Sequence, residues 1–386
     1  MRDVTAGEQS TESPQAVHVG GGAAAPREIM SFGTFDAAVG RTHIHSVDPQ
    51  LLVPPRADEL FGLYDHVSTA LTGDFSEAAK QSALDQLFTG LRDRKLAMAP
   101  ADWKALVAAS RQHPLLQLVH QDPFTFRAFS KPRGYAGDAV MMDYIYGREE
   151  HWAPPEATDI GRSVFQFTTS APASEGVRAR RAYIATRIDR LVEERRHPHI
   201  LAIAAGHMRE ASMSAAVRRR KTGRYIALDA DAESLREVER SYGSYGVETV
   251  TASFRRLLTD PAGIGEFDFV YSTGLFDYLN QRTARRLVLG MFQMLRPGGK
   301  LLVANFLPGV RDIGYMETFM DWELIYRSRR DMVDLTMDIP EEEVEEVRIV
   351  SEDCRNIVFL ELRKTSFARN HCPAYGSCER CHPRNA

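Results

Sequence analysis

The stretch HPHILAIAAGHMREA, from His197 to Ala211, holds the strongest local pattern in the chain. An apolar run, Ile200 to Ala205, is followed by a lone glycine, Gly206, and then by polar residues. A buried strand that turns sharply into a helix has this pattern. Many cofactor-binding folds open with such a unit but usually carry more glycine, so the stretch is either a glycine-poor nucleotide loop or an ordinary strand end.

The composition fits a globular protein of one or two domains. The 386 residues are 44% apolar, which is enough for a sizeable core. The net charge of −4 gives no electrostatic reason to expect binding to nucleic acid or to an anionic membrane. The basic run Arg178 to Arg181 lies in a helix-like stretch, and we interpret it as a solvated helix face.

The sequence also indicates where the protein is located. No apolar run approaches the roughly 18 residues that a membrane-spanning helix needs, and the N-terminus lacks the apolar segment of a signal peptide. Only four cysteines occur, which is no disulfide framework for this length. We therefore expect a cytoplasmic protein without membrane insertion; no feature of the sequence indicates an oligomeric state.

Changes in composition divide the chain into four parts. Residues 1–50 are rich in small residues and predict a disordered arm. Residues 51–173 predict a helical, substrate-binding cap region, residues 174–364 a cofactor-binding domain, and residues 365–386 a Cys/His-rich tail. Four long helices are expected, at 57–71, at 76–98, from Pro100 through Leu115 and Leu116, and at 174–196.

After residue 196 the pattern alternates between strands and helices, which predicts an α/β fold with a mainly parallel sheet and helices on both faces. The last two strands are separated by a short polar turn and predict an antiparallel hairpin at the sheet edge. A turn at Pro297–Gly299 is expected to end a helix and start a buried strand. The expected strands are 200–204, 225–228, 248–252, 267–272, 300–306, 347–351 and 356–362.

The loop after the first strand limits the choice of cofactor. A dinucleotide fingerprint starting at Gly206 would need glycine at position 208, where Met208 would block a pyrophosphate. S-adenosylmethionine has no phosphates, and one close backbone approach at Gly206 suffices for it. Asp229 ends the second strand, where a carboxylate can accept hydrogen bonds from both ribose hydroxyls; we favour this role over the alternative, a cap on the next helix.

Taken together, these motifs resemble the class I S-adenosylmethionine-dependent methyltransferases. The order strand–AxG–helix, strand–Asp, FDFVYS and LRPGGKLLVANF is the layout of that family, and the resemblance covers roughly residues 174–364. It implies a Rossmann-like sheet with S-adenosyl-L-methionine as cofactor. The chain departs from the family at Ala204 and Met208, where an acidic residue and a second glycine are usual.

A narrower resemblance involves KPRGYAGDAVMMDYIYG, AAGHMREA, STGLFDYL and METFMDWELIYR. These segments resemble a bacterial subgroup that includes synthases of 3-hydroxy fatty acid methyl ester signals and relatives that cyclise S-adenosylmethionine to azetidine-2-carboxylate. Members of the subgroup carry a helical N-terminal extension. The resemblance implies methyl transfer to a small, carboxylate-bearing metabolite, with chemistry at the cofactor's Cγ and a non-catalytic cofactor-binding partner as the alternatives.

Several residues are candidates for the site. For the chemistry we expect Tyr135, Asp138, Asp277 and Asn305, since methyl transfer needs positioning, and a base only where the acceptor arrives protonated. Asp138 and Asp277 could instead be inert helix caps. An aromatic wall is expected from Tyr315, Trp322 and Tyr326. For the cofactor we expect Ala205, Gly206, His207, Arg209, Asp229, Ser253, Tyr271 and Thr273.

The tail HCPAYGSCERCHPRNA is a separate candidate for a metal site. It gathers potential zinc ligands, of which a Cys-x2-Cys pair is the best part of the pattern. The spacing matches no standard zinc finger, so a frayed tail is the alternative. The predicted ligands are Cys372, Cys378, Cys381 and His382.

Overall fold

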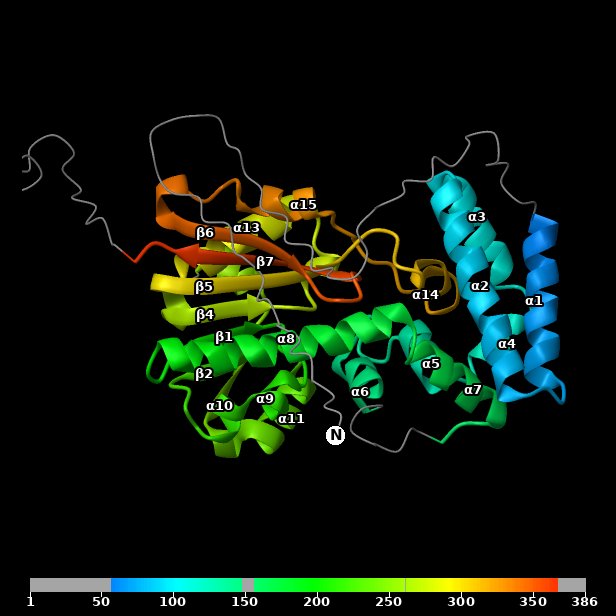
Figure 1. Cartoon of the computed structure of the whole chain (residues 1–386), viewed down its shortest axis with the longest axis horizontal. Coiled ribbons are helices and arrows are strands. Elements are labelled where there is room, and N and C mark those ends of the chain that lie inside the picture. Colours follow the sequence, from blue (N-terminus) through cyan, green and yellow to red (C-terminus); the bar gives the residue numbers. More distant parts are fainter. Residues whose placement is uncertain (1–56, 148–155, 261, 367–386) are drawn as a thin grey trace, which may run out of the picture.

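The computed structural model describes residues 57–147, 156–260 and 262–366 (Figure 1). The predicted arm at 1–50 and the zinc ligands Cys372, Cys378, Cys381 and His382 lie outside the described residues. Within the described part of the chain, no group of three or more His, Cys, Asp or Glu residues could hold a metal ion. No helix in these ranges is both long and apolar enough to cross a membrane.

Seven strands form one sheet in the order β3-β2-β1-β4-β5-β7-β6. Strands β1 to β5 pair in parallel, whereas β7 pairs antiparallel with β5 and with β6, the edge strand. The predicted α/β sheet with a C-terminal antiparallel hairpin is therefore confirmed. The strands are β1 (Ile200–Ile203), β2 (Tyr225–Asp229), β3 (Val247–Thr251), β4 (Phe267–Ser272), β5 (Leu295–Phe306), β6 (Val344–Ser351) and β7 (Ile357–Lys364).

The prediction of a turn before the fifth strand was wrong. Strand β5 begins at Leu295 and runs through Pro297–Gly299, with a shift in its register against β4 between Phe267 and Phe269. Gly298 has a φ of +70°, which a residue with a side chain rarely adopts. The glycines therefore make an irregularity inside a long strand, not a break before a short one.

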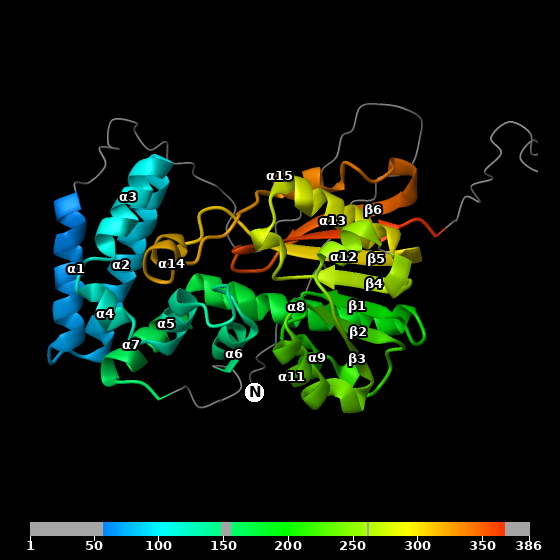
Figure 2. The same cartoon turned by 180° about the vertical axis from the view of Figure 1, so that it is seen from behind.

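Helices cover both faces of the sheet because strand side chains alternate between two cores. Ile200 and Ala202 point into one core, and Leu201 and Ile203 into the other. On the first face lie α8 (Pro172–Glu194), α9 (Glu210–Met213), α10 (Ala215–Arg218) and α11 (Ala232–Tyr242) (Figure 1). On the second face lie α12 (Arg255–Thr259), α13 (Gln281–Gln293) and α15 (Arg329–Val333) (Figure 2).

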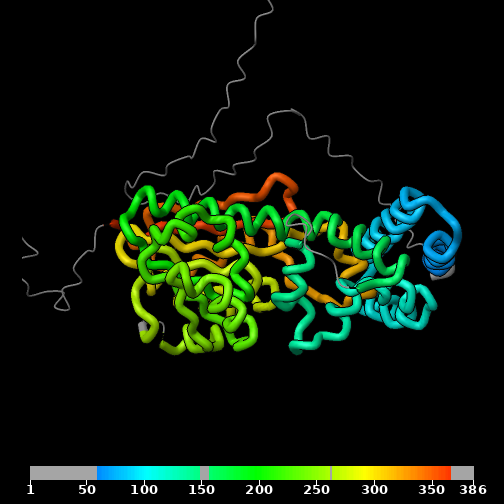
Figure 3. The backbone as a smooth tube through the Cα atoms, turned by 90° about the horizontal axis from the view of Figure 1, so that it is seen from below, coloured from blue at the N-terminus to red at the C-terminus, as the bar shows by residue number. Residues whose placement is uncertain are grey.

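The N-terminal helices lie beside the sheet, at the end to which the strands β1, β2 and β4 point, and not over its faces (Figures 1 and 3). They are α1 (Ala57–Thr72), α2 (Glu77–Ala97), α3 (Pro100–Ser110), α4 (Leu115–Val119), α5 (Pro123–Ser130), α6 (Ala139–Gly147) and α7 (Asp159–Thr168). The expected third helix is in fact two, α3 and α4, because Pro114 cannot continue a helix through its missing N–H.

The helical region is joined to the sheet domain by packing as well as by the chain. Helix α14 (Ile313–Phe319), which follows β5, lies against α2 and α3. Its Glu317 carboxylate accepts hydrogen bonds from Lys95 Nζ and Trp103 Nε1, both at 2.6 Å. One core cluster runs from the sheet face into these helices. The domain boundary at residue 173 stays a prediction, and the packing across it is continuous.

Candidate active site

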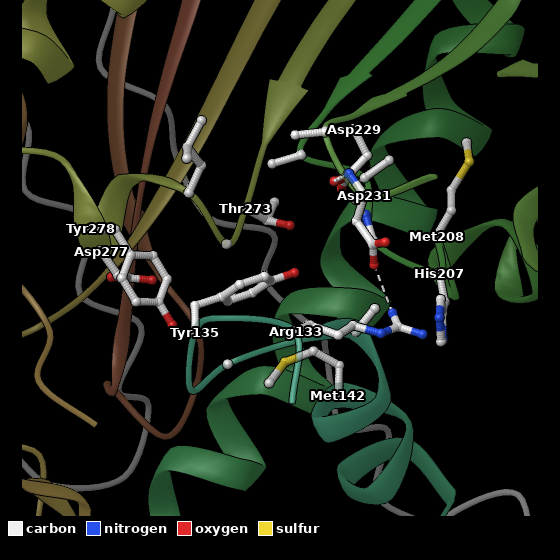
Figure 4. Close-up of a pocket in the computed structure, with 18 of the residues that line it drawn as sticks. Arg133, Tyr135, Met142, His207, Met208, Asp229, Asp231, Thr273, Asp277 and Tyr278 are labelled. Carbon is white, nitrogen blue, oxygen red and sulfur yellow. Dashed lines mark hydrogen bonds and ion pairs between the residues drawn. The ribbon is translucent and has the colours of Figure 1, made fainter. Parts of the chain in front are cut away.

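A cleft of about 820 Å³ lies between the carboxyl ends of β1, β2 and β4 and the start of α6 (Figure 4). Ligands of open parallel sheets bind at this edge. The volume falls within the usual range of ligand pockets, about 300–1,000 Å³. The walls come mainly from the sheet loops and from residues 131–138 with helix α6, and Arg180 of α8 and Trp322 also line the cleft.

The loop after β1 has an unusual backbone. Ala204, Gly206 and Met208 all have positive φ angles, of 52°, 54° and 54°. Two of these are not glycine, and such residues in the left-handed region cost free energy that the surroundings must supply. A Cβ at Gly206 would meet the Cβ of Ala139 at 3.3 Å, so the start of α6 packs directly on the loop.

Asp229 at the end of β2 fastens this loop. Its carboxylate accepts hydrogen bonds from the backbone N–H of Gly206 at 2.8 Å and of Asp231 at 2.9 Å. Burial raises the pKa of Asp229 above its ordinary value, although these hydrogen bonds oppose the shift. A carboxylate has about four acceptor sites, so two backbone bonds leave capacity for hydroxyl groups of a ligand.

Asp143 ties α6 to the same loop. Its carboxylate accepts two hydrogen bonds from Arg209, at 2.8 and 2.7 Å, and lies 2.8 Å from Nδ1 of His207. Burial opposes ionisation, yet the bonds from Arg209 and His207 hold the pKa of Asp143 below its usual value. The Nε2 atom of His207 is buried and has no hydrogen-bond partner within the described residues.

The segment Lys131–Asp138 forms the outer wall. Arg133 donates to Asp231 at 2.8 Å, and Tyr135 points into the space between Asp231 and Asp277 (Figure 4). Gly137 lies so close to Tyr278 and Trp322 that a Cβ would collide with both side chains. An alanine at this position would therefore force Tyr278 and Trp322 to shift.

The far end of the cleft combines an acid with aromatic rings. Asp277 accepts the backbone N–H of Phe306 at 2.8 Å, and burial raises its pKa to about 6, although Arg180 opposes the shift. Beside it, Trp322 Nε1 donates to the Tyr278 hydroxyl at 2.8 Å. Of the three residues expected for the aromatic wall, Trp322 lines the cleft, whereas Tyr315 stacks on Phe88 inside the helical core and Tyr326 packs against the same core.

The structure brings many of the predicted site residues together. Tyr135 and Asp277 line the cleft among the residues expected for the chemistry. So do these residues expected for the cofactor: Ala205, Gly206, His207, Arg209, Asp229 and Thr273. Lining a cleft does not assign a role, and their functions stay predictions.

Four predicted residues do not line the cleft, and each has a structural partner. Asp138 is fully buried, pairs with Arg127 at 2.7 Å and caps α6 through the N–H of Met141. Asn305 is also fully buried and donates to the Ile325 carbonyl at 2.8 Å.

The other two belong to the set expected for the cofactor. Tyr271 is buried, lies 2.7 Å from the Tyr225 hydroxyl and donates to Glu210 at 2.6 Å. Ser253 is exposed and accepts the N–H of Arg255 at 3.3 Å. We therefore assign none of the four a contact with a ligand.

The interpretation of Arg178 to Arg181 as a solvated face was wrong for two of its members. Arg180 is 6% exposed and Arg181 is 3% exposed. Both lie on the buried stripe of α8, which also contains Val177 and Ile184. The helical spacing of these four positions was the signal that could have found them.

Comparison with known proteins identifies one part of the chain. A family described as "Methyltransferase domain" matches residues 200–299. No curated protein matches. The matched range includes the loop at Gly206, Asp229 and the strands β1 to β4.

Solved structures similar to this chain share little of its sequence. A possible exported protein from Bordetella parapertussis is 14% identical, with 81% of this chain and 97% of that chain covered and a TM-score of 0.49. The N-methyltransferase NodS from Bradyrhizobium japonicum is 14% identical over 47% of this chain and 95% of its own, with a TM-score of 0.35. Magnesium protoporphyrin IX methyltransferase from Synechocystis is 10% identical over 58% and 98%, with a TM-score of 0.37.

These likenesses are too weak to say anything about substrate, and the identification rests on the family match and the sheet. The chain is a transferase that contains a methyltransferase domain at residues 200–299, built on a Rossmann-like class I methyltransferase sheet.

Proposed function

We propose that this protein is an S-adenosylmethionine-dependent methyltransferase acting on a small, carboxylate-bearing metabolite. The observation that carries the proposal is the junction of Gly206 and Asp229, which both line the cleft, with a partly buried carboxylate that accepts the Gly206 N–H and keeps unused acceptor capacity. Both lie at the carboxyl edge of a parallel sheet, where a nucleoside would be bound.

The charge of the cleft fits this cofactor better than a dinucleotide. Among the described residues that line it, three arginines face six carboxylates, those of Asp143, Glu210, Asp229, Asp231, Glu233 and Asp277. A pyrophosphate would be repelled by this excess of negative charge. A sulfonium cation would be attracted to it and to the aromatic rings at the far end.

When bound, S-adenosylmethionine supplies an activated methyl group, so the protein mainly needs to position the reactants and exclude water. The loop at Gly206 and Asp229 would hold the adenosyl part. Tyr135, Tyr278 and Trp322 would enclose the acceptor side and exclude water from it. Asp277 has a pKa of about 6, so at pH 7 it is mostly ionised and could take a proton from a protonated acceptor.

The carboxylate-bearing acceptor, a role in signal or specialised metabolism and a cytoplasmic location rest on the sequence. The methyl ester subgroup resemblance supports the first two. An acceptor carboxylate would itself be the nucleophile and would need no base.

Product analysis tests the proposal. Purified full-length protein is incubated with S-adenosylmethionine alone and with a panel of small carboxylates, and the nucleoside products are separated by chromatography. S-adenosylhomocysteine that forms only with an acceptor supports methyl transfer. Methylthioadenosine that forms without an acceptor would instead indicate chemistry at the cofactor's Cγ. Tight binding of S-adenosylmethionine without turnover would indicate a non-catalytic cofactor-binding partner. Failure to bind S-adenosylmethionine would overturn the proposed function.

A further inference from the structure

Three arginines of the described part of the chain line the cleft, and Arg180 differs from the other two. Arg133 is paired with Asp231 at 2.8 Å, and Arg209 with Asp143 at 2.7 Å. Arg180, on α8, forms no ion pair with any residue that the structure describes. Among the residues that the structure describes, Arg180 is therefore a cleft-lining cation without an ion-paired carboxylate.

Arg180 also bonds the side chain of Tyr146, and its contacts within the described residues are with neutral groups. One Nη donates to the backbone carbonyl of Thr273 at the end of β4, and the other lies 3.9 Å from the thioether sulfur of Met142. A thioether is a poor acceptor. The guanidinium is held by Thr273 and Tyr146, and Arg180 lines the cleft.

Arg327, a second buried arginine, is an example of an arginine with a purely structural role in this protein. Arg327 is 1% exposed, and it also has no ion pair within the described residues. Its three nitrogens donate to the carbonyls of Phe276 and Leu279 and to the side chains of Gln281 and Asn305. Arg327 is therefore complete without a ligand, and it does not line the cleft.

Burying a charge without a partner is costly, and the cost is recovered when a carboxylate binds it. Arginine presents parallel N–H groups that match a carboxylate. The 6% exposure of Arg180 means that water screens such a bond little. A ligand carboxylate is the group that would complete this site.

The residues around Arg180 limit the chemical class of the ligand further. The carboxylates of Asp277 and Glu210 line the same cleft and interact with Arg180 through space without pairing with it. They would repel a simple carboxylate. A ligand that carries an ammonium group next to its carboxylate satisfies both signs of charge.

We propose that Arg180 binds the carboxylate of an α-amino acid group in the cleft. This inference rests on the proposed function, because the group could come from two sources: the methionyl end of the cofactor, or an amino acid acceptor. Both present the same chemistry to Arg180, and they are separated by experiment.

The first experiment measures the affinity for the cofactor. The Kd values of S-adenosylmethionine and its decarboxylated analogue are compared by calorimetry for the wild type, Arg180→Gln and Arg187→Gln. Arg187 lies on the same helix, pairs with Glu361 at 2.6 Å and is outside the cleft, so it is the matched control. If Arg180 holds the methionyl carboxylate, the wild type and R187Q prefer the carboxylated form by about 10- to 100-fold, and R180Q loses this preference.

The second experiment tests the binding of an amino acid acceptor. Protein saturated with S-adenosylhomocysteine is screened by thermal shift with the common L-amino acids and the corresponding amines. If Arg180 serves the acceptor, R180Q binds both cofactor forms as the wild type does but loses the response to the amino acid. A response equal for amino acid and amine in the wild type counts against the proposal.

Two further measurements distinguish a loss of the proposed contact from a loss of folding. Circular dichroism checks each variant, and Arg180→Lys keeps the charge while losing the planar fork, so it should retain an intermediate preference. R180Q that folds and leaves the results of both experiments unchanged overturns the inference, as does the absence of any carboxylate preference in the wild type. A wild type that binds no S-adenosylmethionine refutes the proposed function instead.

Discussion

Replacing Asp229 by alanine should uncouple the nucleoside from the sheet. The Asp229 carboxylate bonds the N–H groups of Gly206 and Asp231 at 2.8 and 2.9 Å. The substitution removes both acceptors together with the capacity proposed for the ribose hydroxyls. Two losses are therefore expected, one in stability and one in binding, and they have different sizes.

The binding loss can be estimated from hydrogen bonds to a charged group, each worth about 1.5–3 kcal/mol. Two ribose bonds at the lower end of that range give about 3 kcal/mol, or roughly 100-fold in Kd. The stability loss from two unpaired backbone N–H groups is about 1–3 kcal/mol, since water can reach part of the loop. The affinity should therefore fall steeply while the protein stays folded.

Calorimetry with S-adenosylhomocysteine measures the first loss, and urea denaturation measures the second. Asp268 is the matched control, because it is 4% exposed and also accepts a backbone N–H, from His199 at 2.8 Å, but it does not line the cleft. Asp268→Ala should cost stability without changing the Kd. The reasoning is refuted if D229A binds within about threefold of the wild type, or if D268A weakens binding as much.

Three other substitutions have defined outcomes. Gly137→Ala should lower kcat/KM by about 10-fold or more without unfolding the protein, because the new Cβ displaces the side chain of Trp322. Asp312→Asn should raise the free energy of unfolding at pH 8 by about 2–4 kcal/mol and by less at pH 5, since burial raises the pKa of Asp312 to about 7. Asp143→Asn should lower stability by about 2 kcal/mol and weaken S-adenosylhomocysteine binding, because Arg209 loses a partly buried ion-pair partner.

The expected pH dependence of the stability change at Asp312 follows from the difference in its pKa between the folded and unfolded states. The folded state keeps a proton that the unfolded chain releases above about pH 4, so wild-type stability falls as the pH rises from about 4 to 7. Urea denaturation curves that shift equally at pH 5 and pH 8 would contradict this.

Controls exist for the other two substitutions. Gly62→Ala is the control for Gly137, because a Cβ there meets nothing within 4 Å; equal kinetic effects would count against the packing argument. For Asp143, unchanged binding in the variant would show that helix α6 does not hold the loop.

Much of the fold was predictable because its signals are local. The central strands β1, β2 and β4 are short, largely apolar runs between polar segments, and their boundaries were predicted to within one residue. Asp229 was found for the same reason: the end of a strand is visible in the sequence, and its direction places the residue at the cleft. The irregularity in β5 was missed because Pro297–Gly299 has the composition of a turn, while its pairing with β4 is a tertiary property.

Side-chain orientation was the part that could not be predicted. Asp138 and Asp277 have the same chemistry and similar local sequence, and both were equally plausible as caps or as functional residues. In the structure Asp138 forms an ion pair with Arg127, whereas Asp277 lines the cleft. The difference is made by residues distant in sequence, such as Phe306, whose N–H binds Asp277. Arg180 was missed because a run of arginines is usually solvated, and only the packing of α8 buries it.

The two walls of the cleft have different structural origins, and this has a consequence for specificity. The loop at Gly206 and Asp229 belongs to the matched methyltransferase domain, whereas Tyr135 and Asp143 come from the segment that precedes it. Asp143 bonds His207 and Arg209, so the proposed acceptor wall is fastened to the proposed cofactor loop. Substitutions at Tyr135, which forms no hydrogen bond to the loop within the described residues, are therefore expected to change the acceptor while the proposed cofactor contacts stay fixed. Substitutions at Asp143 should disturb both, because they release the wall and the loop together.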